Sequence, residues 1–129
     1  MSGHRYTLDE AQALLPEART RIAEAAGQVA ELHRLLLELR AGTSPANTLD
    51  RARTLEAGVD DAFGWFEERG VQIKSLSPAL LDFPARAIRG GDALDVLLCW
   101  RDDEPTVAYY HPIDGGYGVR EPVAFLDRV

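Results

Sequence analysis

The spacing of apolar residues changes in character near the middle of the chain. In the first half, apolar or small residues recur at alternating spacings of three and four, which places them along one stripe of an α-helix. In the second half, short apolar runs are separated by turns rich in Gly, Pro and Asp, which is typical of strands. The pattern predicts an α+β protein: a long antiparallel helical hairpin over residues 7–70, followed by a small, mostly antiparallel β-sheet over residues 71–129.

The first helix of the hairpin has a start signal and an end signal. Thr7 and Glu10 fit a capping box, and Gly42 is typical of a helix end. Because Pro16 is tolerated only near the start of a helix, it predicts a short helix over residues 8–15 and a long one that begins near Pro16. The apolar stripe of the long helix follows a coiled-coil spacing. Its members are Leu15, Ala18, Ile22, Ala25, Val29, Leu32, Leu36 and Leu39.

A second helix is predicted from Asn47 or Thr48 to Gly70. A short loop between helices of similar length indicates an antiparallel hairpin. Several apolar residues lie outside the two apolar stripes, which together form the seam between the helices. A homodimer through the helices is therefore expected, with a four-helix bundle across a two-fold axis. The alternative is that the sheet covers them all. The apolar positions of the second helix are Ala52, Leu55, Val59, Ala62 and Phe66, and those off the seam are Leu14, Leu35, Leu37, Phe63 and Trp65.

The second half of the chain predicts strands joined by tight turns. A central strand is expected over residues 94–100, between the turn at Gly90-Gly91 and the polar turn at 102–105. The remaining predicted elements are a strand over 71–74, an apolar run over 80–83 that stops at Pro84, a return strand over 106–111, a loop over 114–118 and an edge segment over 119–125.

Composition narrows the class of protein. A chain of 129 residues is long enough for a single domain, here residues 1–129. Its net charge of −7 argues against nucleic-acid binding, and no apolar run is long enough for a membrane span or typical of a signal peptide. The single cysteine, Cys99, excludes an internal disulfide and a multi-cysteine metal site. We expect a soluble cytoplasmic protein with no cofactor and no nucleic-acid or membrane partner.

Short motifs in a fixed order resemble a prokaryotic family known as domain of unknown function 2203. The motifs are residues 6–11 with 14–16, then 70–71, 81–84, 98–101 with 104–105, and finally His111 with Gly116 and Arg120. The resemblance covers nearly the whole chain, from Tyr6 to about Pro122. It implies a long helical hairpin with a small β-rich end, and it implies no assigned activity.

Asp82 and His111 are the polar residues that most need an explanation. Asp82 lies between Leu81 and Phe83, where a carboxylate requires a partner, and Arg86 or Arg120 is the expected one. His111 ends a predicted strand. Together with Asp82 and Glu104 it offers a weak metal site of one imidazole and two carboxylates. The alternative is a histidine bonded to the backbone or to one carboxylate.

The glycine-rich stretch 115–120 is a candidate anion site, because such a loop exposes amide groups and Arg120 adds a bidentate fork. His111 would lie nearby and Tyr117 would close the pocket. The alternative is a plain turn between strands. Cys99 lies in an apolar run beside Trp100, which indicates a buried, unreactive thiol.

Three functions from different classes are compatible with this sequence. The favoured one is a non-catalytic binding or adaptor module that captures a small anion or a protein segment through Arg120, Arg86 and His111. The second is a small metal-dependent enzyme that uses Asp82, Glu104 and His111. The third is a structural protein that pairs with a larger partner through its helices. No catalytic residue is assigned, because no nucleophile and base stand at a recognisable spacing.

Overall fold

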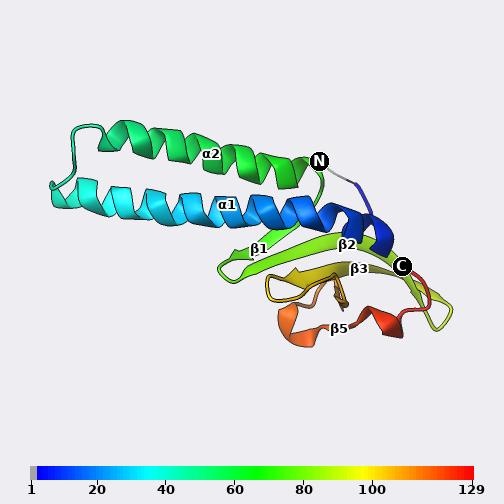
Figure 1. The fold of residues 1–129 in the computed structure, drawn as a ribbon. Helices are drawn as coiled ribbons and strands as arrows, with labels where there is room; N and C mark the ends of the chain where they lie inside the picture. Colours follow the sequence, from blue (N-terminus) through cyan, green and yellow to red (C-terminus); the bar gives the residue numbers. More distant parts are fainter. Residues whose placement is uncertain (1–2) are drawn as a thin grey trace.

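The computed structural model describes residues 3–129 and arranges them in two layers (Figure 1). Helices α1 (Leu8–Ala41) and α2 (Thr48–Glu68) run antiparallel and cover one face of a five-stranded antiparallel sheet. The strands follow in sequence order: β1 (Gln72–Leu76), β2 (Ala79–Arg89), β3 (Asp92–Arg101), β4 (Tyr109–Pro112) and β5 (Glu121–Pro122). This arrangement confirms the predicted α+β class with a helical hairpin and a small antiparallel sheet.

Helix α1 is one continuous helix, so the predicted break at Pro16 is wrong. The capping box is confirmed: the Glu10 amide donates to Thr7 Oγ1 (3.0 Å), and the Thr7 amide donates to Glu10 Oε1 (2.8 Å). The predicted end at Gly42 is also confirmed, with Gly42 in the left-handed conformation at φ 73°. Pro16 itself faces solvent while Leu15 and Ala18 are buried on either side of it. The packing of Leu15 and Ala18 therefore stabilises the helix by more than the loss of the one hydrogen bond that proline cannot donate.

The buried stripe of α1 departs from the predicted heptad near the end of the helix. Ala25 is buried as expected, but Leu35 is buried in place of Leu36, which is 47% exposed. At about 100° per residue, Leu36 stays on the face that Ala18 and Ile22 present to the core, but this end of α1 extends beyond the sheet, so Leu36 is exposed. Leu35 lies about 100° away around the helix and is buried in the contact between α1 and α2.

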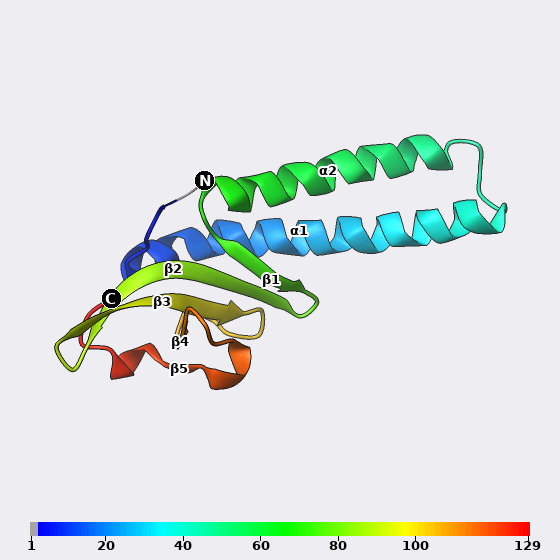
Figure 2. The ribbon, with the colours of Figure 1, turned by 180° about the vertical axis from the view of Figure 1, so that it is seen from behind.

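Part of the hairpin extends beyond the sheet (Figures 1 and 2). Of the apolar residues off the seam, Trp65 is buried in the core and Leu14 packs against it. Leu37 and Phe63 stay exposed, so the sheet covers only some of these residues. The overhanging end is held by contacts between the two helices, where Leu35 and Ala52 are buried.

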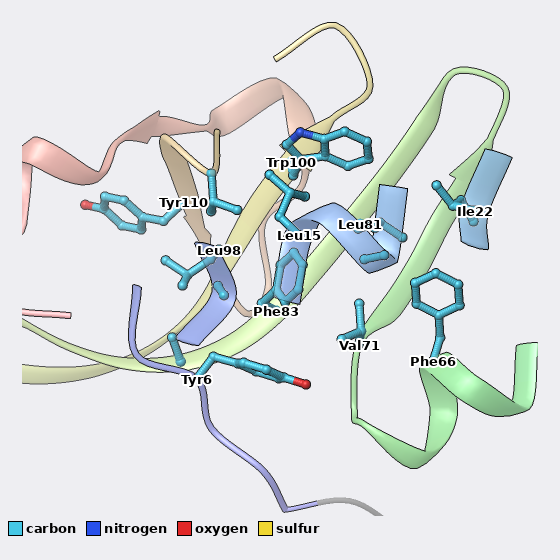
Figure 3. Packing of buried hydrophobic residues seen from close by; sticks show 14 of the residues in the cluster. Tyr6, Leu15, Ile22, Phe66, Val71, Leu81, Phe83, Leu98, Trp100 and Tyr110 are labelled. Atoms are coloured by element: carbon cyan, nitrogen blue, oxygen red, sulfur yellow. The ribbon is translucent and has the colours of Figure 1, made fainter. Parts of the chain in front are cut away.

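The core lies between the helices and the sheet (Figure 3). Trp100 is 1% exposed, and its indole N–H donates to the Glu104 carbonyl (2.8 Å). Gln12 ties α1 to the segment before β4, because its amide group both donates to and accepts from the backbone of Val107 (2.8 and 2.9 Å). The labelled core residues are Tyr6, Leu15, Ile22, Phe66, Val71, Leu81, Phe83, Leu98, Trp100 and Tyr110.

Strand β2 continues through Pro84, so the predicted stop at this residue is wrong. In a β-strand, the amide and the carbonyl of one residue point toward the same neighbouring strand. The Pro84 carbonyl points away from β3, because it accepts a hydrogen bond from the Tyr6 amide (2.7 Å). Strand β1 pairs with β2 only as far as Asp82. An amide at Pro84 would therefore point toward the edge of β2 that β1 no longer covers, and no described strand there requires a hydrogen-bond donor.

The remaining β-elements lie near their predicted places, but the return strand β4 begins at Tyr109 rather than at residue 106, and β5 covers only two residues of the predicted edge segment 119–125. Gly90 and Gly91 form the turn between β2 and β3 with positive φ angles of 58° and 84°, which explains the glycine pair. Strand β3 is the central strand, and β5 is an edge segment of two residues. Neither helix in the described residues combines the length and apolarity that crossing a membrane requires.

Candidate functional site

The polar site lies on the face of the sheet that points away from the helices. Leu81, Phe83 and Leu98 point into the core, and successive side chains in a strand alternate between the two faces. Asp82 on β2 and Cys99 on β3 therefore point to the opposite face, and the register places them side by side. The chain after β4, which includes the short 3-10 helix η1 (Tyr117–Val119), crosses the molecule on this side (Figure 1).

Asp82 is paired with His111, so the prediction that an arginine is its partner is wrong. The two side chains are 1% and 2% exposed, and Asp82 Oδ2 lies 3.0 Å from His111 Nε2. Arg86 is exposed further along β2, and Arg120 pairs with Glu104 instead. The pairing depends on the sheet order, because β3 places β4 within reach of the polar face of β2.

Both ring nitrogens of His111 face acceptor atoms. Nδ1 lies 2.8 Å from the carbonyl oxygen of Pro112, which only accepts, so Nδ1 carries a proton. Nε2 faces a carboxylate oxygen, and a proton or another cation must lie between these two atoms. The second carboxylate oxygen, Asp82 Oδ1, is buried and has no hydrogen-bond partner in the part of the chain that is described. Apart from the weak thiol donor of Cys99, which shares a hydrogen bond with the Asp82 carboxylate, no donor among the described residues meets this oxygen, so the site can take up a stronger donor or a cation.

Cys99, rather than the predicted Glu104, is the third ligand-type residue beside Asp82 and His111. One ligand atom from each of the three side chains lies within 4.8 Å of the others, and all three residues are buried. Burial raises the pKa of the Cys99 thiol to about 12; the Asp82 carboxylate adds to this rise and the Arg120 guanidinium opposes it. A protonated thiol beside a histidine with both nitrogens occupied lacks the arrangement of a catalytic nucleophile.

Glu104 and Arg120 form a separate, half-buried ion pair. Arg120 Nη1 lies 2.8 Å from Glu104 Oε2, and the Glu104 carboxylate also accepts from the Arg101 amide (2.8 Å). Burial disfavours the charged Arg120 side chain, but Glu104 more than offsets this, so the pKa of Arg120 lies above its ordinary value. The guanidinium packs against the rings of Tyr109 and Tyr117, at 4.3 and 4.0 Å from the ring centres. Arg120 thus reaches the same face as His111, but its charge is already neutralised.

A pocket of about 250 Å³ opens above the Asp82–His111 pair, and we call it the sheet pocket. Lys74 contributes an exposed ammonium and makes no ion pair within residues 3–129. Tyr117 accepts from Arg101 Nη1 (3.1 Å), which leaves its own hydroxyl proton for another acceptor. Arg86 does not line this pocket. The lining residues are Lys74, Leu80, Asp82, Cys99, His111, Gly115, Gly116 and Tyr117.

A larger hollow of about 730 Å³ lies beside Arg89, Tyr110 and Glu121. Three of its polar side chains, from Arg89, Tyr110 and Glu121, already satisfy one another. Arg89 donates to the Tyr110 hydroxyl and to Glu121, and the Tyr110 hydroxyl donates to Glu121 Oε2 (3.0 Å). This cluster therefore links the end of β2 to β4 and β5 and has no unmet polar group of the kind that Asp82 presents.

Fold and site together define a small α+β protein with a helical hairpin and a polar pocket on the opposite face of its sheet. The chain belongs to the family described as uncharacterized conserved protein (DUF2203), whose model matches residues 4–123. This confirms the resemblance found in the sequence motifs. No curated protein and no solved structure matches the chain.

Proposed function

We propose that the protein is a non-catalytic binding module that holds a small anionic ligand in the sheet pocket. The observation that carries the proposal is the pairing of two unmet groups in one pocket. Asp82 Oδ1 lies buried without a partner at its base, and Lys74 stands without an ion pair at its opening. A fitting ligand places an anionic group near Lys74 and a donor or cation near Asp82.

Two of the arginines expected at this site take different roles in the proposal. Arg120 is held by Glu104 and packs on Tyr117, so it positions a wall of the pocket rather than gripping the ligand. Arg86 lies on another part of β2 and takes no part. The single domain and a cytoplasmic location belong to the proposal too, since a free thiol such as Cys99 stays reduced in that compartment.

Changing Lys74 to Met is expected to weaken binding of a small anion by roughly 10–100-fold, because a hydrogen bond to a charged group contributes about 1.5–3 kcal/mol. Titration calorimetry with a panel of carboxylates and phosphate esters measures this. The matched control is Arg53→Met, which removes an exposed cation of α2. No binding by the wild-type protein, or equal weakening in both variants, would contradict the proposal.

We also propose that the partner of the helices is a second copy of the chain. Leu35 does not contribute, because it is buried inside the hairpin. Leu36, Leu37 and Leu49 are 47%, 49% and 48% exposed, and they lie close to the end of α1 and the start of α2, which form the overhanging end of the hairpin. Two overhanging hairpins related by a two-fold axis would bury these residues in a four-helix bundle.

Light scattering at tens of micromolar protein is expected to give twice the chain mass of 14.2 kDa. The double variant Leu36→Glu with Leu37→Glu is expected to return it to a single chain mass, because the charges cannot be buried in an apolar interface. Ile113→Glu, at an exposed residue outside the hairpin, serves as the control and should remain a dimer. A wild-type mass of one chain would exclude this interface.

A further inference from the structure

Three side chains on neighbouring strands converge at the base of the sheet pocket. Asp82 comes from β2, Cys99 from β3 and His111 from β4, and one ligand atom of each lies within 4.8 Å of the others. Tetrahedral zinc has bonds of about 2.0–2.3 Å, which places its ligand atoms roughly 3.5 Å apart. Small rotations of these side chains would therefore bring all three ligand atoms onto one central ion.

We infer that Asp82, Cys99 and His111 form a binding site for a divalent transition-metal ion of the zinc class. The inference deepens the proposed function, because the ion would lie at the base of the same pocket. Thiolate and imidazole ligands select zinc-like ions over magnesium and calcium, which prefer oxygen ligands. Thiolate and carboxylate together cancel the two positive charges of the ion, so the loaded site is neutral in a buried place.

The orientation of His111 supports a metal rather than a structural hydrogen bond alone. A histidine that ligates a metal donates its other ring N–H to a carbonyl or carboxylate, and Nδ1 of His111 does this toward Pro112. This leaves the Nε2 lone pair pointing toward the Asp82 carboxylate, 3.0 Å away. A divalent ion bound between them would accept the lone pair of Nε2 and balance the charge of the carboxylate.

Asp82 Oδ1 is the second, independent indication. It is a buried carboxylate oxygen without a hydrogen-bond partner among the described residues, and it belongs to a side chain that is 1% exposed. Buried acceptors in folded proteins nearly always have a partner. An ion coordinated by Asp82 would provide one.

Metal binding also gives Cys99 a role. Coordination would replace the proton of its thiol by the metal, release that proton to solvent and leave a thiolate bound to the ion. Three protein ligands leave one position open. This position would face the sheet pocket, where water or the anionic ligand held by Lys74 completes the coordination.

Titration of chelator-treated protein with Co²⁺ tests the site, since cobalt reports its ligands by absorption. We expect one equivalent per chain, a thiolate-to-cobalt charge-transfer band that reports on Cys99, the only cysteine, and displacement by Zn²⁺. Cys99→Ala is expected to abolish the band and to weaken binding by more than the roughly 10–100-fold loss typical of removing a mere orienting partner. His33→Gln, at an exposed histidine of α1, is the control and should bind as the wild type.

Two results would overturn the inference: no cobalt binding by folded wild-type protein, or binding without a thiolate band that Cys99→Ala leaves unchanged. Circular dichroism checks the fold of each variant, and Cys99→Ser is used if Cys99→Ala does not fold. Lys74→Met separates this inference from the proposed function, because it should keep the cobalt spectrum. Anion binding that depends on Lys74 in metal-free protein, with no cobalt site, would leave the proposed function standing and refute the metal site.

Discussion

Replacing Trp100 with Ala is expected to lower the free energy of unfolding by about 3–5 kcal/mol, the usual cost of removing a large aromatic side chain from a core. Trp100 lies on the central strand, is 1% exposed and sits beside Leu15 of α1 in the packed layer (Figure 3). The substitution leaves a cavity between helix and sheet. It also deprives the Glu104 carbonyl of the indole donor.

Urea denaturation followed by circular dichroism measures this change. A loss of this size is a large fraction of the roughly 5–15 kcal/mol that stabilises a typical domain. Phe125→Ala is the matched control, because Phe125 is 54% exposed and its removal should change stability by less than about 0.5 kcal/mol. A loss below about 1 kcal/mol at Trp100 would mean that the layers are not held together by this side chain.

The elements that could be predicted from the sequence are those with local signals. The capping box at Thr7, the left-handed Gly42 and the Gly90-Gly91 turn each depend on a few neighbouring residues. The two prolines were misread because their tolerance depends on distant parts of the chain. Pro16 stays within the helix because its neighbours Leu15 and Ala18 pack in the core, and Pro84 lies beside the end of β1.

The site could be predicted only in part for the same reason. That Asp82 needs a partner follows from its apolar neighbours, but the identity of the partner depends on strand register. A shift of one residue in the pairing would turn Cys99 to the other face. Glu104 was expected beside His111, but the turn after β3 directs its carboxylate to the Arg101 amide and to Arg120. The alternation of side chains along β2 and β3 is the signal that would have placed Cys99 with Asp82.

The two members of the buried pair are expected to differ in what their removal costs. His111→Ala leaves the Asp82 carboxylate buried without its cationic or donor partner, and we expect a loss of about 3–5 kcal/mol. Asp82→Ala leaves an imidazole that keeps its bond to the Pro112 carbonyl and needs no charge, so the expected loss is about 1–3 kcal/mol.

Urea denaturation of both variants and the double variant, in chelator at one pH, measures the difference. The chelator removes any contribution from a bound ion, so the cycle reports on the pair alone. Because the Asp82→Ala change removes the carboxylate that His111→Ala would leave unpaired, the double variant is expected to lose about 0.5–3 kcal/mol less than the sum of the two single losses. Simple additivity would show that the two side chains do not support one another. If Asp82→Ala lowered the free energy of unfolding more than His111→Ala, the result would show that the imidazole depends on its partner more than the carboxylate does.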